Sequence, residues 1–243
     1  MKAIGFDQKI TLPYLDITAN TLRIHLQKKE VYDVLDGHLL TLIKGDKSRK
    51  NAITILMKIW SSVDENIPDL QKKIIREYPF FTDKEKLLIH YCLTSIAYPF
   101  FMTQMSFVGK QLKMSDVIFS KSIIAEMKKN YGDRRRVEVA TGAVFSSVKD
   151  WDILRMIRAG SYEKNISNVD TSKTVIKSLM IEVIMHNLNT NAVPFEYINN
   201  NAVFFPFDYS ISIGDIDQKR FLVTKTIRDI IIERNPKVLI PIE

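Results

Sequence analysis

A concentration of basic side chains is the feature of this 243-residue sequence that points most directly to a chemistry. The window from Lys110 to Arg136 holds eight bases and three acids, so it carries +5 of the chain's formal net charge of +7. The eight bases are Lys110, Lys113, Lys121, Lys128, Lys129, Arg134, Arg135 and Arg136. Because ammonium and guanidinium groups neutralise phosphate oxygens, the pattern favours a polyanionic partner.

Residues that support catalysis or metal binding are scattered through the chain. The four histidines are His25, His38, His90 and His186, and none has a His, Cys or carboxylate partner at metal-ligand spacing. Cys92 is the only cysteine, which excludes an internal disulfide, and both Cys92 and His90 are predicted to be core residues. The sequence contains no Gly-rich phosphate loop and no Gly-x-Ser-x-Gly motif. We therefore expect no enzyme, no metal and no cofactor, with an enzyme whose site is assembled from distant residues as an open alternative.

Two helices and a hairpin are predicted to position the basic residues. The pattern predicts a helix over 115–130 with Ser115 as its N-cap, a turn at 131–133 and a second helix from Arg134 to about Val148. Two short extended runs around the turn 159–161 predict a hairpin that reaches Ile166. The residues of the second helix expected to face the core are Val137, Ala140, Thr141, Val144, Val148 and Trp151.

This order of elements resembles winged helix-turn-helix DNA-binding proteins, whose second helix enters the major groove. The resemblance covers about 50 residues and rests on the helix Ser115–Asn130, the turn YGD, the stretch RRRVEVATGAVFSSVKDWDIL and the hairpin RMIRAGSYEKN. Two features depart from the family pattern. Glu138 on the exposed face would repel phosphate, and no outward Asn or Gln is placed to read adenine. Both features favour contact with the DNA backbone over sequence-specific base reading.

The resemblance implies a set of residues that bind double-stranded DNA. They are Lys128, Lys129, Arg134, Arg135, Arg136, Ser146, Lys149, Arg155, Arg158 and Lys164. The bases at the start of the second helix would fix the docking register, and those on the hairpin would reach the flanking backbone or a minor groove. Because winged helices also serve as protein–protein modules, an adaptor that grips an acidic protein and a transcriptional regulator are the alternatives.

The remainder of the chain is predicted to be mainly helical. Helical patterns cover 18–42, 50–63, 68–78, 87–108 and 170–189, a last helix is predicted over 226–234, and 202–207, 209–213 and 220–224 are predicted to be extended. Thr82 and Glu85 form a capping-box pattern, and Pro99 must kink or divide the run that follows it. We expect a mainly α fold with small β-hairpins: a helical bundle over 1–109, a winged helix-turn-helix over 110–166 and a C-terminal α+β segment over 167–243.

Location and biological setting follow from broader features. No stretch approaches the roughly 18 to 20 apolar residues that span a bilayer, and 1–15 lacks a signal-peptide pattern, so a cytoplasmic protein without a membrane partner is expected. The size, the helix-rich N-terminal half and the basic module are similar to the small DNA-binding A component of bacterial BREX phage-exclusion systems. That similarity implies antiviral defence within a larger assembly that contains other protein subunits.

Overall fold

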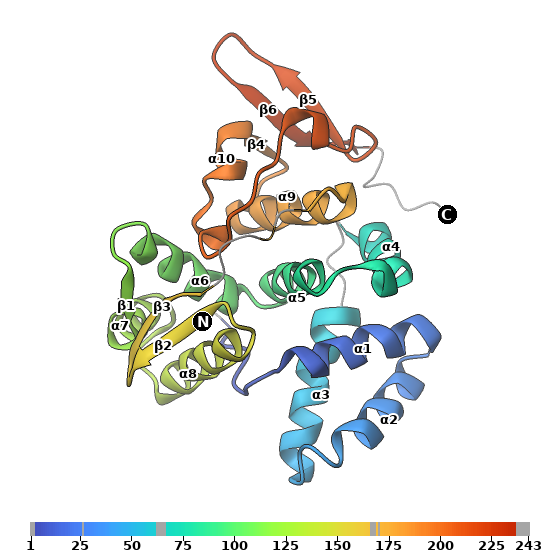
Figure 1. The fold of residues 1–243 in the computed structure, drawn as a ribbon, viewed down its shortest axis with the longest axis vertical. Coiled ribbons are helices and arrows are strands. Elements are labelled where there is room, and N and C mark those ends of the chain that lie inside the picture. The colour runs from blue at the N-terminus through green and yellow to red at the C-terminus, as the bar shows by residue number, and fades with distance from the viewer. Residues whose placement is uncertain (1–2, 26, 62–66, 166–168, 170, 237–243) are drawn as a thin grey trace.

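The computed structural model describes residues 3–25, 27–61, 67–165, 169 and 171–236. Within these residues the chain is mainly helical, with two small antiparallel sheets (Figure 1). The expectation of a mainly α fold with small β elements is therefore confirmed. The expected boundary between 166 and 167, and the end of the predicted hairpin at Ile166, lie outside the described residues.

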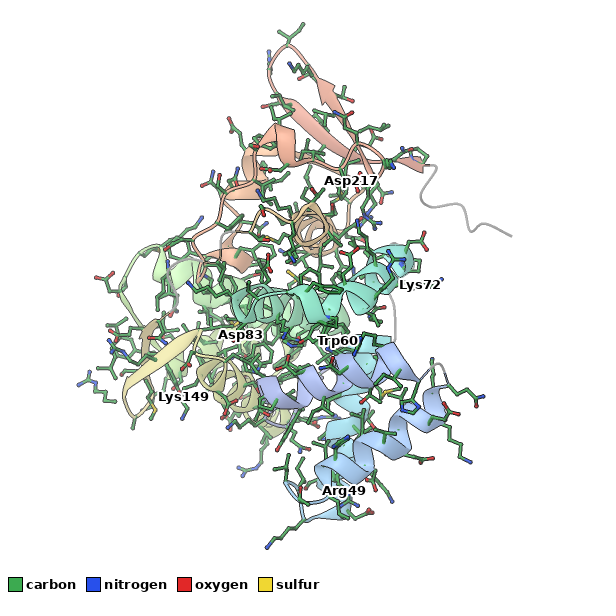
Figure 2. The ribbon with its side chains drawn as sticks, turned by 45° about the vertical axis from the view of Figure 1, so that its right-hand side comes forward. Arg49, Trp60, Lys72, Asp83, Lys149 and Asp217 are labelled. Atoms are coloured by element: carbon green, nitrogen blue, oxygen red, sulfur yellow. The ribbon has the colours of Figure 1, made fainter. Side chains whose placement is uncertain are left out.

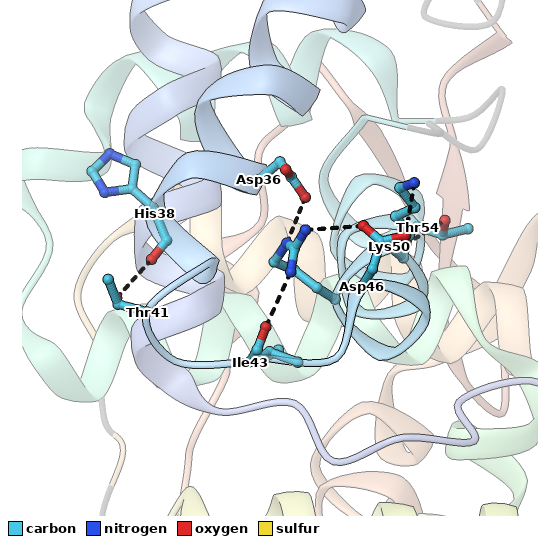
Figure 3. A network of polar contacts seen from close by, with 8 residues as sticks. Asp36, His38, Thr41, Ile43, Asp46, Lys50 and Thr54 are labelled. Carbon is cyan, nitrogen blue, oxygen red and sulfur yellow. Dashed lines mark hydrogen bonds and ion pairs between the residues drawn. The ribbon is translucent and has the colours of Figure 1, made fainter.

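The N-terminal part of the chain consists of helices joined by short connections. They are α1 (Leu12–Ile24), α2 (Lys28–Leu39), α3 (Asp46–Ser61) and α4 (Pro68–Glu77). Helices α1 and α4 each have a proline in the first turn, where its missing N–H would have no helical acceptor. Buried Arg49 ties α3 to α2, because its guanidinium donates to Asp36 at 2.7 Å, to Asp46 at 3.0 Å and to the carbonyl of Ile43 at 3.3 Å (Figure 3).

Two consecutive helices, α5 (Asp83–Ala97) and α6 (Pro99–Leu112), form the centre of the molecule. The capping box is confirmed: the amide of Glu85 donates to the Thr82 hydroxyl at 3.3 Å, and the amide of Thr82 donates to the Glu85 carboxylate at 2.9 Å. Pro99 divides the apolar run into these two helices, as predicted. Helix α5 is buried over most of its length and lies between α1 and α3 on one side and α9 on the other (Figure 1).

The predicted basic region forms the first sheet and two further helices. Its elements are β1 (Val117–Phe119), α7 (Ser120–Tyr131), α8 (Arg135–Asp150), β2 (Leu154–Arg158) and β3 (Ser161–Lys164), and the strand order is β1-β3-β2. The second helix and the hairpin are confirmed. The predicted helix start at Ser115 is wrong, because β1 pairs with β3 and α7 begins only at Ser120. Gly132, with φ of 90°, makes the turn between the two helices.

The C-terminal segment contains α9 and the second sheet. Its elements are α9 (Thr174–Leu188), β4 (Ala192–Pro194), α10 (Phe195–Asn199), β5 (Phe221–Lys225) and β6 (Ile230–Arg234), and the strand order is β4-β6-β5. The extended prediction over 220–224 is confirmed, but Ala202–Phe204 is a 3-10 turn. The predicted helix over 226–234 is wrong. Three consecutive β-branched residues, Ile230 to Ile232, lie instead in β6, where Ile231 and Ile232 pair with both β4 and β5.

Gly109 of α6 allows the turn Ala202–Phe204 to pack directly on that helix. A Cβ atom at Gly109 would lie 1.8 Å from the carbonyl oxygen of Ala202. We expect Gly109→Ala to lower the free energy of unfolding by about 1–3 kcal/mol, since the backbone must move to admit the methyl group. Urea denaturation measures this, with Gly37→Ala as control because a Cβ there meets nothing within 4 Å. Equal stability of Gly109→Ala and the parent chain would contradict the close approach.

Candidate nucleic-acid interface

Helix α8 is buried along one face and exposed along the other. Its buried residues are Val137, Ala140, Thr141, Val144, Phe145, Ser147 and Val148, and Trp151 directly after the helix is also buried. The predicted core face of this helix is therefore confirmed. The outward residues recur at alternating steps of four and three: Arg135, Val139, Gly142, Ser146 and Lys149. These five residues are called the α8 stripe below.

The N-terminal segment 3–11 packs against the flank of α8. The amide of Ile10 donates to the Ser147 hydroxyl at 2.9 Å, and the indole N–H of Trp151 donates to the carbonyl of Ile10 at 2.9 Å. Lys9 and Asp150 form an ion pair at the end of the helix. This segment positions α8 from the side while Arg135, Val139, Gly142 and Lys149 remain exposed and Ser146 half-buried.

Most of the predicted DNA-binding bases have acidic partners. The ion pairs are Lys128 with Asp133 and Glu138, Lys129 with Glu126, Arg136 with Asp7, Arg155 with Glu163 and Lys164 with Asp208. Arg134 instead donates to the carbonyl of Tyr131 at 2.7 Å, and Arg158 donates to the Ser161 hydroxyl at 3.4 Å. Exposed ion pairs contribute only about 0–1 kcal/mol, so a phosphate can displace the acid at modest cost.

Glu138 is held by the preceding helix rather than left free to repel an anion. Its carboxylate pairs with the ammonium group of Lys128, which also contacts Asp133 at 2.8 Å. Hydrogen bonds to Asp133 and then to Glu138 raise the pKa of Lys128. The ion pair spans the turn between α7 and α8, so the negative charge predicted to oppose DNA is matched by a base on the neighbouring helix.

The two ends of the α8 stripe carry cations without an acidic partner in the part of the chain that the structure describes. Arg135 stands in the first turn of α8 and Lys149 in the last, and both are exposed. Lys149 follows Arg135 by 14 positions in the sequence, which along a helix is a distance of about 21 Å. The structure thus leaves one cation without an acidic partner at each end of the stripe.

Gly142 lies at the centre of the α8 stripe and is not among the residues predicted to bind DNA. It lies in the interior of α8, it is exposed, and a Cβ atom there would meet nothing within 4 Å. A glycine inside a helix costs roughly 0.5–1 kcal/mol relative to alanine. No neighbour among the described residues lies close enough to demand a glycine here. The position is therefore open for the close approach of a partner. The feature of the sequence that could have singled out this residue is a glycine in the middle of a predicted amphipathic helix.

The β2–β3 hairpin lies beside this helix and carries exposed Met156, Ile157 and Arg158. Its turn contains Gly160, with φ of 77°, and the carbonyl of Gly160 accepts a hydrogen bond from the amide of Ser120 at 2.8 Å. The hairpin tip is therefore anchored to the first residue of α7. This contact holds the exposed residues of β2 at a defined place relative to the two helices.

His90 and Cys92 are buried in α5, which confirms that both are core residues. The Nε2 atom of His90 lies 2.8 Å from the Tyr78 hydroxyl and 3.1 Å from the Asp16 carboxylate, so this cluster links α5 to α1. Burial lowers the pKa of His90, which keeps the imidazole neutral near pH 7. Among the described residues, no three His, Cys, Asp or Glu side chains gather closely enough to hold a metal ion.

Comparisons with known protein families, with curated proteins and with solved structures find no significant match to this chain. In the described part of the chain, no helix has both the length and the apolar character needed to cross a bilayer.

Proposed function

We propose that the protein binds double-stranded DNA without catalysing a reaction, by inserting α8 into the major groove. The α8 stripe carries this proposal, because it is an outward helix face with small residues at its centre and a free cation at each end. The order β1-α7-α8-β2-β3 and the strand order β1-β3-β2 support the interpretation as a winged helix-turn-helix. In this interpretation α1 to α4 form a bundle that braces the module.

The dimensions of α8 suit a groove. Its 16 residues extend over about 24 Å, and a major groove about 12 Å wide admits one helix. The centre of the stripe, Val139, Gly142 and Ser146, has no long side chain to hold the backbone away from the base edges. Arg135 and Lys149 then lie far enough apart to reach phosphates at the two ends of the inserted helix. The exposed residues of β2 would contact the neighbouring backbone or minor groove.

We expect the double variant Arg135→Ala/Lys149→Ala to bind duplex DNA at least roughly tenfold more weakly at low salt. The slope of log affinity against log salt should fall by about 2, because each lost phosphate contact removes close to one unit. Fluorescence anisotropy with a labelled duplex, measured between about 50 and 200 mM salt, gives both quantities.

The matched control for this experiment is Lys72→Ala/Lys73→Ala, which removes the same charge from two exposed lysines of α4. Figure 2 shows Lys72 and Lys149 on opposite sides of the molecule. The control should keep the parent affinity and slope. An equal loss in both double variants would indicate a general effect of net charge and would overturn the assignment to α8.

An adaptor that binds another protein is the second candidate function. The exposed apolar side chains of Val139, Met156 and Ile157 lie on α8 and the adjacent hairpin, and they favour a protein contact. Failure of the parent chain to bind duplex DNA at low salt would support the adaptor and overturn the DNA proposal.

We further propose that the protein works as one subunit of a bacterial DNA-directed assembly such as a phage-defence system. The similarity to the BREX A component noted in the sequence supports this setting. Genes for a DNA methyltransferase and an ATPase beside this one would agree with it, whereas an adjacent operon under its control would favour transcriptional regulation.

A further inference from the structure

The C-terminal segment repeats the element order of the proposed DNA-binding module. One unit runs α6, β1, α7, α8, β2, β3, and the other runs α9, β4, α10, β5, β6 (Figure 1). In both sheets the last strand lies in the middle and pairs antiparallel with the other two, giving β1-β3-β2 and β4-β6-β5. Both units therefore present a helix, an edge strand and a hairpin in the same succession.

The second unit lacks a helix equivalent to α8. Between α10 and β5 the chain forms 3-10 turns at Ala202–Phe204 and Ile213–Asp215. The first of these turns packs on α6, where Gly109 permits the close contact with Ala202. This unit has no long helix to place in a groove, and its projecting element is the β5–β6 hairpin, which extends away from the rest of the molecule (Figure 1).

The tip of the β5–β6 hairpin is a hydrogen-bonded turn with an exposed apolar residue. The amide and hydroxyl of Thr226 both donate to the carbonyl of Asp229 at 2.8 Å, and the amide of Asp229 donates to the Thr226 hydroxyl at 2.9 Å. Strand pairing continues up to the turn, where Lys225 lies opposite Ile230. Ile227 is fully exposed at the apex. The turn therefore holds Ile227 outward instead of letting it fold back on the sheet.

Cations flank this apolar apex. Lys225 and Arg228 are exposed and have no ion pair among the residues described, and Asp229 is the single acid of the turn. The β2–β3 hairpin likewise places an exposed isoleucine, Ile157, next to an exposed arginine, Arg158. An apolar side chain between basic ones is the chemistry by which proteins wedge into a minor groove, the apolar group entering a base step and the cations contacting phosphates.

We propose that the tip of the β5–β6 hairpin is a second duplex-DNA contact, which inserts Ile227 into a minor groove while Lys225 and Arg228 bind the flanking phosphates. The inference rests on the proposed function, because it assigns a further contact to the same ligand. Two buried arginines, Arg220 directly before β5 and Arg234 at the end of β6, fasten the base of the hairpin to Glu182 of α9. The tip is thus carried on a fixed support.

The test is the double variant Ile227→Ser/Arg228→Ala, compared with Arg23→Ala/Ile24→Ser at the exposed end of α1. Both variants remove one exposed isoleucine and one exposed arginine. The hairpin variant is expected to bind duplex DNA roughly tenfold more weakly, with a salt slope lower by about 1, whereas the control keeps the parent values. Combined with Arg135→Ala/Lys149→Ala, the fold-losses should multiply, since separate contacts contribute additively to the binding free energy.

The outcomes separate this inference from the proposed function. Unchanged affinity in the hairpin variant, with intact binding by the parent chain, overturns the second contact and leaves the role of α8 standing. A parent chain that does not bind the duplex at low salt overturns both. An equal loss in the α1 control also overturns the inference, because the effect would then not belong to the hairpin tip.

Discussion

Replacing Gly142 with glutamate is expected to weaken duplex binding by roughly 30- to 150-fold while leaving the folded chain at least as stable. The added carboxylate would stand at the centre of the α8 stripe, between the positions assigned to DNA phosphates. Like charges brought together at an interface cost several kcal/mol, and about 2–3 kcal/mol corresponds to this loss of affinity. Anisotropy with a labelled duplex measures the binding, and urea denaturation measures the stability.

The surroundings of Gly142 explain why Gly142→Glu is expected to be at least as stable as the parent chain. A Cβ atom at Gly142 meets nothing within 4 Å, and glutamate is a much better helix former than glycine. Glu138 lies one turn away, but its charge is matched by Lys128. We therefore expect Gly142→Glu to stay folded, and urea denaturation checks this before a loss of binding is assigned to the interface.

Gly142→Gln is the control that separates charge from bulk. Glutamine has the same size and reach as glutamate but no charge, so it reports the steric part of the effect alone. We expect Gly142→Gln to bind the duplex more tightly than Gly142→Glu at low salt. The affinities of the two variants should converge at higher salt, because salt screens the charge of the carboxylate. Parent-like binding by Gly142→Glu would show that the α8 stripe does not face the duplex.

The parts of the fold that the sequence predicted are those governed by local chemistry. The capping box at Thr82, the break at Pro99 and the buried face of α8 each depend on residues within a few positions of one another. Strand β1 was missed because it has three residues and exists through its pairing with β3, more than 40 positions later. The run Ile230 to Ile232 was misread as helix because a short apolar run fits either structure until its neighbours in space are known.

The sequence predicted where the candidate site lies, but it did not predict which of its basic residues are paired with acids. The sequence placed α8 correctly and identified its outward residues Ser146 and Lys149. It could not show that Arg136 meets Asp7, 129 positions away, or that Lys164 meets Asp208. Long-range partners of this kind decide which of the predicted DNA-binding bases are paired with acids, and among the described residues they leave Arg135 and Lys149 of the α8 stripe without an acidic partner.

Glu182 of α9 is a buried residue whose loss should strongly destabilise the fold. Its carboxylate is 1% exposed and accepts hydrogen bonds from Arg220 and Arg234, both at 2.7 Å. These contacts join α9 to both strands of the β5–β6 hairpin. Two guanidinium groups therefore depend on one buried carboxylate, and Arg234 has the side-chain oxygen of Asn191 as a further partner at 2.6 Å. The arrangement is costly to desolvate and is stable only when complete.

We expect Glu182→Gln to lower the free energy of unfolding by about 3–5 kcal/mol, because the side chain keeps its shape but leaves two buried cations uncompensated. Chemical denaturation measures the change, and Glu233→Gln at an exposed position of β6 is the control, expected within about 0.5 kcal/mol of the parent. Replacing Glu182, Arg220 and Arg234 together by methionine should restore much of the loss, since it removes the charges as well as their partner. A cost below about 1 kcal/mol for Glu182→Gln would mean that water reaches the arginines, and the base of the hairpin would then not be the fixed support that the second DNA contact requires.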